Sequence, residues 1–295
     1  MTDGRSRSLR PYVRSARPRQ WFRNLLVFAA PIAGGVITDP AVLRLAVTTF
    51  IAFCAASSGI YYLNDVTDID ADRAHPTKSL RPIASGSINK STATAVGVLL
   101  ILLSLYLAYF VSWATVTVIL SYVLLVTFYS LYLKHRPVLD VMAIAFGFLL
   151  RAIAGGVATD TEPSRWFIIV VAFASLFAVT VKRAAETRET GGGGETRGVL
   201  TLYDDGYFDR VRIVSLSVVL IAYCLWAFER AGTSTASVPW SELSIIPVAY
   251  GLLKYELLAE GATVENPEEL VLGDRGIMVS GLLWALLFVL GTQFA

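Results

Sequence analysis

Residues 93–133 read ATAVGVLLILLSLYLAYFVSWATVTVILSYVLLVTFYSLYL and contain no charged side chain. An apolar run of about 20 residues is long enough to cross the hydrocarbon core of a bilayer as a helix. The stretch therefore predicts two such helices, with a break near Trp113. Unpaired backbone groups are not tolerated in lipid, and a helix pairs all of them within one segment. The stretch thus predicts an all-α membrane protein.

Similar apolar runs recur along the whole chain. Hydrophobic residues make up 55% of the sequence and charged residues 16%, against about 25% charged in an average soluble domain. This composition excludes an ordinary soluble enzyme and a disordered chain, and it gives no sign of a nucleic-acid partner. We expect nine transmembrane helices, over Trp21–Ile37, Ala41–Leu63, Ala93–Ser112, Ala114–Leu133, Val138–Val157, Trp166–Val181, Val211–Phe228, Ile245–Leu258 and Ile277–Phe294.

The positive charges are unevenly distributed between alternate loops. Almost every Lys and Arg lies in the N-terminal tail or in every second loop, whereas the opposite loops hold only Arg44, Arg165 and Arg230. Cytoplasmic loops carry the excess of Lys and Arg. We therefore expect a multi-pass protein of the cell inner (plasma) membrane with a cytoplasmic N-terminus and an external C-terminus. Residues 1–20 would be a basic cytoplasmic tail, and residues 21–295 a single transmembrane catalytic domain.

An acidic cluster closes the second predicted helix. Asn64, Asp68 and Asp72 stand at positions i, i+4 and i+8 and share one helix face, with Asp65 at its edge. Stacked like charges destabilise a bare helix, and a divalent cation would remove the conflict. Oxygen ligands of this kind favour Mg²⁺, which often shares the phosphate oxygens of a substrate. The cluster predicts a site for magnesium and a phosphorylated ligand.

A basic segment follows the acidic cluster directly. Lys78 and Arg81 precede Pro82 and Gly86, two residues typical of a fixed turn. Arginine binds phosphate through a two-pronged fork and lysine as a point charge. We expect the two side chains to neutralise a phosphate group beside the metal.

These two motifs, Asn-Asp-x-x-Asp-x-x-x-Asp at 64–72 and Lys-x-x-Arg-Pro-x-x-x-Gly at 78–86, resemble those of the UbiA-type membrane prenyltransferase superfamily. The resemblance implies a nine-helix bundle with a cytoplasm-facing cavity and a diphosphate bound through Mg²⁺. It covers almost the whole chain. It does not extend to the second Asp-rich motif of aromatic prenyltransferases, because Lys182, Arg183 and Glu186 occupy that segment. The added positive charge suits a substrate that bears a further phosphate.

The segments Arg17–Asn24, Lys182–Glu186 and Glu265–Arg275 are similar to one branch of that superfamily, the decaprenyl-phosphate phosphoribosyltransferases. This resemblance implies transfer of a 5-phosphoribosyl group from phosphoribosyl diphosphate to decaprenyl phosphate, with release of diphosphate and inversion at C1. The product would lead to the decaprenyl-phosphoryl arabinose donor of cell-wall arabinan. The same resemblance implies a homo-oligomer, namely a trimer.

Two ionisable residues, Asp140 and Arg151, lie inside the fifth predicted helix. Their spacing is close to three helical turns, so they share a face. Charges within a membrane usually mark function, and Arg151 is the stronger candidate because Asp140 lies nearer the interface. Tyr203–Gly206 contains an acidic pair similar to one in soluble phosphoribosyltransferases, but no strand precedes it, and we expect a loop there.

The candidate site combines these groups. We expect Asn64 and Asp68 to be the metal ligands, and Asp65, Asp68 and Asp72 to be the catalytic carboxylates. Which cation meets which phosphate stays open. The substrate-binding candidates are Arg23, Tyr61, Lys78, Arg81, Lys134, Arg151, Lys182, Arg183 and Arg188.

Two other functions compete with phosphoribosyl transfer. An aromatic or quinone prenyltransferase of the UbiA type would need a second acidic cluster after the sixth helix, where Lys182 and Arg183 stand instead. A polyprenyl-phosphate transporter would be expected to show internal repeats and broken helices at the midplane. We find no such repeat, and the ionisable residues gather on one side.

Overall fold

The computed structural model describes residues 9–190, 202–203, 206–233, 237–261, 271 and 273–293. Within these ranges the ordered secondary structure is helical and includes no β-strand. This confirms the predicted all-α class.

Among the residues that the structure describes, seven helices are long and apolar enough to span a membrane. They correspond to seven of the nine predicted segments. The seven helices are α3 (Pro40–Thr67), α5 (Lys90–Tyr109), α6 (Trp113–Leu131), α7 (Leu139–Ala158), α8 (Arg165–Thr190), α9 (Tyr207–Thr233) and α13 (Arg275–Gln293).

Polar side chains fix where three of these helices begin. The Asp39 carboxylate accepts a hydrogen bond from the Ala41 N–H at 2.7 Å, ahead of Pro40 in the first turn of α3. Asn89 and Ser112 accept from Thr92 and Thr115 in the same manner at the starts of α5 and α6. These caps satisfy N–H groups that have no partner within the helix.

The first predicted span has a different form. Residues Pro18–Phe28 wind as a 3₁₀ helix, η1, followed by the short α2 (Ala29–Ala33). We attribute this form to packing against a neighbouring helix. The backbone of η1 lies so close to α7 that a Cβ at Gly155 would overlap the Val27 carbonyl. The eighth predicted span is α11 (Ile245–Gly261), preceded by α10 (Trp240–Leu243). Its 17 residues reach about 26 Å at 1.5 Å per residue, so the count of nine spans stays a prediction.

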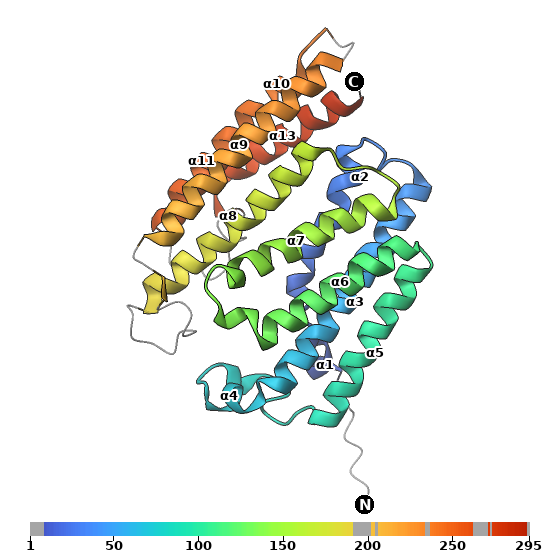
Figure 1. Cartoon of the computed structure of the whole chain (residues 1–295), viewed down its shortest axis with the longest axis vertical. Helices are drawn as coiled ribbons and strands as arrows, with labels where there is room; N and C mark the ends of the chain where they lie inside the picture. The colour runs from blue at the N-terminus through green and yellow to red at the C-terminus, as the bar shows by residue number, and fades with distance from the viewer. Residues whose placement is uncertain are drawn as a thin grey trace, which may run out of the picture.

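The helices form two groups joined through α8 (Figure 1). One group contains η1, α2, α3, α5, α6 and α7; the other contains α9, α10, α11 and α13. Small residues allow close approach in the first group: a Cβ at Gly59 of α3 would lie 2.7 Å from the Gly97 carbonyl oxygen of α5. Phe53, Tyr122 and Leu150 are buried at its centre.

Four of the short helices lie beside α3, against one another or at the C-terminal end of α6. They are α1 (Arg10–Ala16), α4 (Ile69–Ala74), η2 (Lys78–Leu80) and η3 (Leu133–His135). In Figure 1, α4 lies at the end away from α10 and the C-terminus. The acidic cluster therefore lies at one end of the bundle, as a site open to one side of a membrane requires.

Candidate functional site

The acidic cluster lies where α3 gives way to α4. Asp68 separates the two helices, with φ −91° and ψ 13°. The Asp68 N–H donates to the Asn64 carbonyl and the Asp72 N–H to the Asp68 carbonyl, each at 2.8 Å. The i, i+4 backbone pattern thus continues through the junction. The three predicted residues follow one another at successive turns.

Two of the cluster's carboxylates are buried and paired with arginine. The Arg81 guanidinium donates from Nη1 to Asp72 Oδ2 at 2.7 Å and to Asp65 Oδ1 at 3.3 Å. Arg17 donates to the same Asp65 oxygen at 2.5 Å. A buried carboxylate is costly without such partners. The sequence suggested that a metal ion would offset the repulsion between these carboxylates. For Asp65 and Asp72, the structure shows that arginine side chains offset it instead.

Asp68 is the accessible carboxylate of the cluster. Its side chain is 45% exposed, and its Oδ1 lies 3.6 Å from Lys134 Nζ on η3. Within the described residues, no group of three or more His, Cys, Asp or Glu side chains is placed to hold a metal ion. Mg²⁺ does not need such a group, since it is usually bound by one or two carboxylates, several waters and substrate phosphates. Asn64 and Asp68 supply oxygen donors of the required kind.

A basic site lies across α6 from the acidic cluster. Arg183 of α8 is buried, with its side chain 4% exposed, and its Nη1 lies 2.5 Å from Glu186 Oε2. Its Nη2 donates to the Tyr129 hydroxyl at 3.3 Å. Lys182 is more exposed and lies 4.0 Å from Glu186. Two of the predicted substrate-binding cations are therefore adjacent, with one of them held rigidly.

The C-terminal end of α6 joins the two sites. Tyr129, near the end of α6, contacts Arg183, and Lys134, just beyond it, contacts Asp68. Tyr129 and Lys134 are five positions apart in the sequence, and α6 ends between them at Leu131. The acidic and basic sites therefore both adjoin the same end of α6.

Arg151 is buried deep in the first helix group. It donates to Asn24 Oδ1 from Nε at 2.8 Å and to the Tyr122 hydroxyl from Nη2 at 2.8 Å. Its guanidinium also lies 4.6 Å from the Tyr122 ring centre. Within the described residues no carboxylate lies within 4.0 Å of it. These contacts tie η1, α6 and α7 together.

The remaining predicted residues are placed as follows. Tyr61 lies under Arg17, whose guanidinium carbon is 4.9 Å from the ring centre. Arg23 lies over Phe22 at 5.7 Å. Lys78 is exposed on η2. The side chain of Arg188 is outside the described part of the chain.

Three residues that shape the site were not among the predicted site residues: Arg17, Tyr129 and Asp140. Arg17 has a left-handed backbone, with φ 52° and ψ 58°, between α1 and η1. Its partner Asp65 is 48 residues away, so no local pattern could have paired them. Asp140 is fully buried, and its Oδ2 lies 3.8 Å from Arg183 Nε. The sequence does mark Asp140 as an ionisable residue inside a predicted helix, but it favours Arg151, because Asp140 lies nearer the interface.

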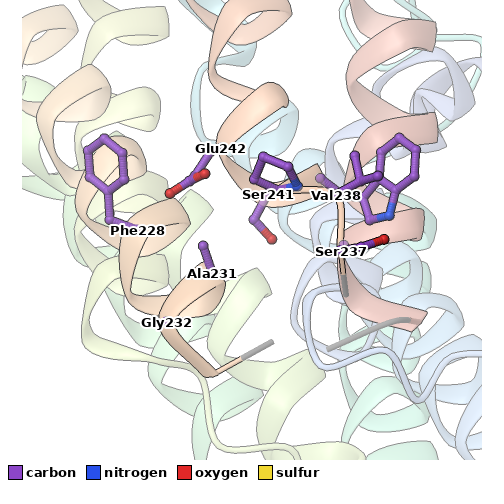
Figure 2. A pocket seen from close by; sticks show the side chains of 10 residues that line it. Phe228, Ala231, Gly232, Ser237, Val238, Ser241 and Glu242 are labelled. Atoms are coloured by element: carbon purple, nitrogen blue, oxygen red, sulfur yellow. The ribbon is translucent and has the colours of Figure 1, made fainter. Parts of the chain in front are cut away.

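A separate cavity of about 350 Å³ lies where α9, α10 and α13 meet. Figure 2 shows Phe228, Glu242 and Ser241 among the side chains around it. This end of the molecule is the one that holds α10 and the C-terminus (Figure 1). None of the predicted site residues lines the cavity, so it is distinct from the acidic and basic sites.

Residues 25–266 match the UbiA prenyltransferase family. The chain belongs to this family. Decaprenyl-phosphate phosphoribosyltransferase from Mycolicibacterium smegmatis is 38% identical over 283 residues, covering 92% of this chain and 89% of that protein. The protein of the same name from Mycobacterium tuberculosis strain H37Rv is 39% identical over 277 residues, covering 92% and 91%.

A UbiA homologue from Archaeoglobus fulgidus, solved with GPP and Mg²⁺, has a similar structure, with a TM-score of 0.72. It is 20% identical and covers 96% of this chain and 99% of its own. At that identity the likeness shows the fold, which confirms the predicted UbiA-type bundle. The chain is thus a multi-pass membrane transferase of the UbiA family.

Proposed function

We propose that this UbiA family member transfers the 5-phosphoribosyl group of phosphoribosyl diphosphate to decaprenyl phosphate and releases diphosphate. Relatives that are 38% and 39% identical bear the name of that activity. The observation that carries the proposal is the pairing of an acidic site at Asp68 with a basic site at Arg183 on one end of the bundle. A donor with a diphosphate at one end and a phosphate at the other requires two such sites.

Donor binding follows from the charges on α3, α4 and η2. Asn64 and Asp68 would hold Mg²⁺, whose charge screens the diphosphate oxygens when it is bound. Arg81 is fixed by Asp65 and Asp72 beside this point. Together with Lys78 it would neutralise the negative charge that develops on the leaving diphosphate. Stabilising charge where it develops is usually the largest contribution to rate.

The transfer itself makes one bond and breaks one bond. An oxygen of the acceptor phosphate attacks C1 of the ribose, and the bond between C1 and the diphosphate oxygen breaks with its electrons on the diphosphate. Attack from the face opposite the leaving group inverts C1. A phosphate monoester has a second pKa near 6, so the acceptor is anionic at neutral pH and needs no general base. This agrees with the positions of His75 and His135, neither of which is buried.

We further propose that the site faces the cytoplasm of an inner (plasma) membrane protein. The N-terminal tail and the loops next to Asp68 and Arg183 together carry most of the chain's Lys and Arg, and such loops stay on the cytoplasmic side. A water-soluble donor would reach the site from there. A lipid acceptor would enter from the bilayer.

The decisive experiment is a transfer assay with the purified protein in detergent, Mg²⁺, decaprenyl phosphate and donor labelled in the ribose. We expect label in the organic phase, lost with EDTA and reduced at least a hundredfold by Asp68→Ala. Asp70→Ala is the matched control, because the Asp70 side chain is 94% exposed and its ion pair to Arg73 is 3.8 Å long. No labelled lipid, together with prenylation of an aromatic acid by a prenyl diphosphate, would replace this proposal with ordinary UbiA chemistry.

A further inference from the structure

Asp140 is a buried carboxylate at the start of α7. It is 0% exposed and lies in the first turn of the helix, where the helix dipole favours a negative charge. Its Oδ1 accepts a hydrogen bond from the Tyr203 hydroxyl at 2.5 Å. A residue between α8 and α9 in the sequence therefore holds the carboxylate in place.

Tyr203 holds the start of α7 through a second bond. Its hydroxyl accepts from the Val138 N–H at 2.6 Å, and Val138 has φ 67°, a value that a β-branched residue rarely adopts. Burial, and then the bond to Asp140, raises the pKa of the Tyr203 phenol, so the hydroxyl keeps its proton at physiological pH. The Tyr203 ring also packs on Tyr207 and Phe208.

The second oxygen of Asp140 is directed at Arg183. Oδ2 lies 3.8 Å from Arg183 Nε, and it is buried without a hydrogen-bond partner in the described part of the chain. A buried carboxylate is stabilised by a close cation. Asp140 on one side and Glu186 on the other therefore restrict the plane of the Arg183 guanidinium.

We propose that Asp140 is a positioning residue, held by Tyr203, that orients Arg183 toward the 5-phosphate of the donor. This inference rests on the proposed function and adds which phosphate Arg183 meets. The diphosphate is assigned to Asp68 and Arg81, so the phosphate at the other end of the ribose falls to the basic site across α6. Asp140 has no exposed surface and acts only through Arg183.

The test is Tyr203→Phe, which removes the hydroxyl and keeps the ring. Because the lost bond acts on the donor only through Arg183, we expect a KM for phosphoribosyl diphosphate that is roughly threefold to tenfold higher, equivalent to the net contribution of one ordinary hydrogen bond. We expect the KM for decaprenyl phosphate to change less than twofold. Tyr207→Phe is the matched control, since its hydroxyl makes no hydrogen bond in the described structure and both KM values should stay as in the unmodified protein.

Two competitive inhibitors test binding at each end of the donor separately. Ribose 5-phosphate carries the terminal phosphate alone, and inorganic diphosphate carries the leaving group alone. In Tyr203→Phe we expect weaker inhibition by ribose 5-phosphate and unchanged inhibition by diphosphate. Weaker inhibition by diphosphate alone, equal weakening of both, or no change in either would overturn the inference.

A second variant keeps the test possible if Tyr203→Phe does not fold. Asp140→Asn keeps an oxygen acceptor for Tyr203 and removes the charge that faces Arg183, and it should shift the same constants in the same direction. Size-exclusion chromatography identifies the variant that is properly folded. If the unmodified protein transfers label but neither inhibitor pattern appears, this inference fails and the proposed function stands. If the unmodified protein transfers none, the proposed function fails first.

Discussion

At the scale of single residues, the structure shows that the three carboxylates Asp65, Asp68 and Asp72, which are alike in the sequence, differ in burial and in ion pairing. Asp65 and Asp72 are buried in ion pairs with Arg17 and Arg81, whereas the Asp68 side chain is half exposed. A buried pair contributes to the fold because removal of one partner leaves the other charge without compensation. An accessible carboxylate is free to bind a ligand. The first two residues therefore have a structural task that Asp68 does not share.

This difference predicts opposite outcomes for two substitutions. Asp72→Ala should lower the free energy of unfolding by about 3 kcal/mol, because Arg81 loses its shortest ion pair. Asp68→Ala should leave the free energy of unfolding within about 0.5 kcal/mol of the original, because the side chain is accessible, while transfer activity is lost. Thermal unfolding in detergent and the transfer assay measure the two effects. Equal stability losses for both variants would contradict the distinction.

The residue types of the site were predictable, but several of their partners were not. The spacing of Asn64, Asp68 and Asp72 predicted one helical face, and the structure keeps that register across the junction. The contact of Arg17 with Asp65 joins residues 48 positions apart, and that of Tyr203 with Asp140 joins residues 63 apart. Such pairs depend on the packing of whole helices, which no local pattern contains.

At the scale of helices, apolar runs predicted the positions of seven membrane spans. The first expected span, Trp21–Ile37, instead begins as the 3₁₀ helix η1, a form that hydropathy could not predict. Hydropathy reports whether a segment suits lipid but not which helical form it takes. η1 has its form because its backbone lies directly on α7 at Gly155, and because Asn24 bonds Arg151 of α7 and Ser57 of α3. These contacts hold Arg17 near the acidic cluster.

A side chain at Gly155 should therefore displace η1. Gly155→Ala places a methyl group against the Val27 backbone, which has no rotamer with which to avoid it. We expect a loss of about 2 kcal/mol or more in the free energy of unfolding. Gly281→Ala is the control, because a Cβ there meets no atom within 4 Å, and alanine is the better helix former. If both variants melt at the original temperature, the proposed packing of η1 is wrong.

At the scale of the whole molecule, one end of the bundle carries most of the Lys and Arg side chains and the opposite end carries few of them. Asp68, Arg81, Lys134 and Arg183 belong to the first end, and the loop between α7 and α8 belongs to the second. Since Lys and Arg are retained on the cytoplasmic side, this asymmetry predicts the orientation of the whole chain.

Cysteine labelling in intact cells tests that orientation. A membrane-impermeant maleimide should label Glu162→Cys, in the loop between α7 and α8, without permeabilisation. It should label Ser87→Cys only after permeabilisation. Both positions are exposed. The background is Cys224→Ala, because Cys224 is partly exposed while Cys54 is buried, and the reverse labelling pattern would invert the topology.

The position of α8 between the two helix groups has a consequence for how the protein responds to its ligands. Asp68 belongs to the first group, and Arg183 belongs to the helix that connects it to the second (Figure 1). A molecule bound at both points adds its binding free energy to the association of the first group with α8. Saturation with donor should then slow proteolysis and detergent inactivation of the entire bundle. Ribose 5-phosphate or diphosphate alone, each touching one side, should protect it far less.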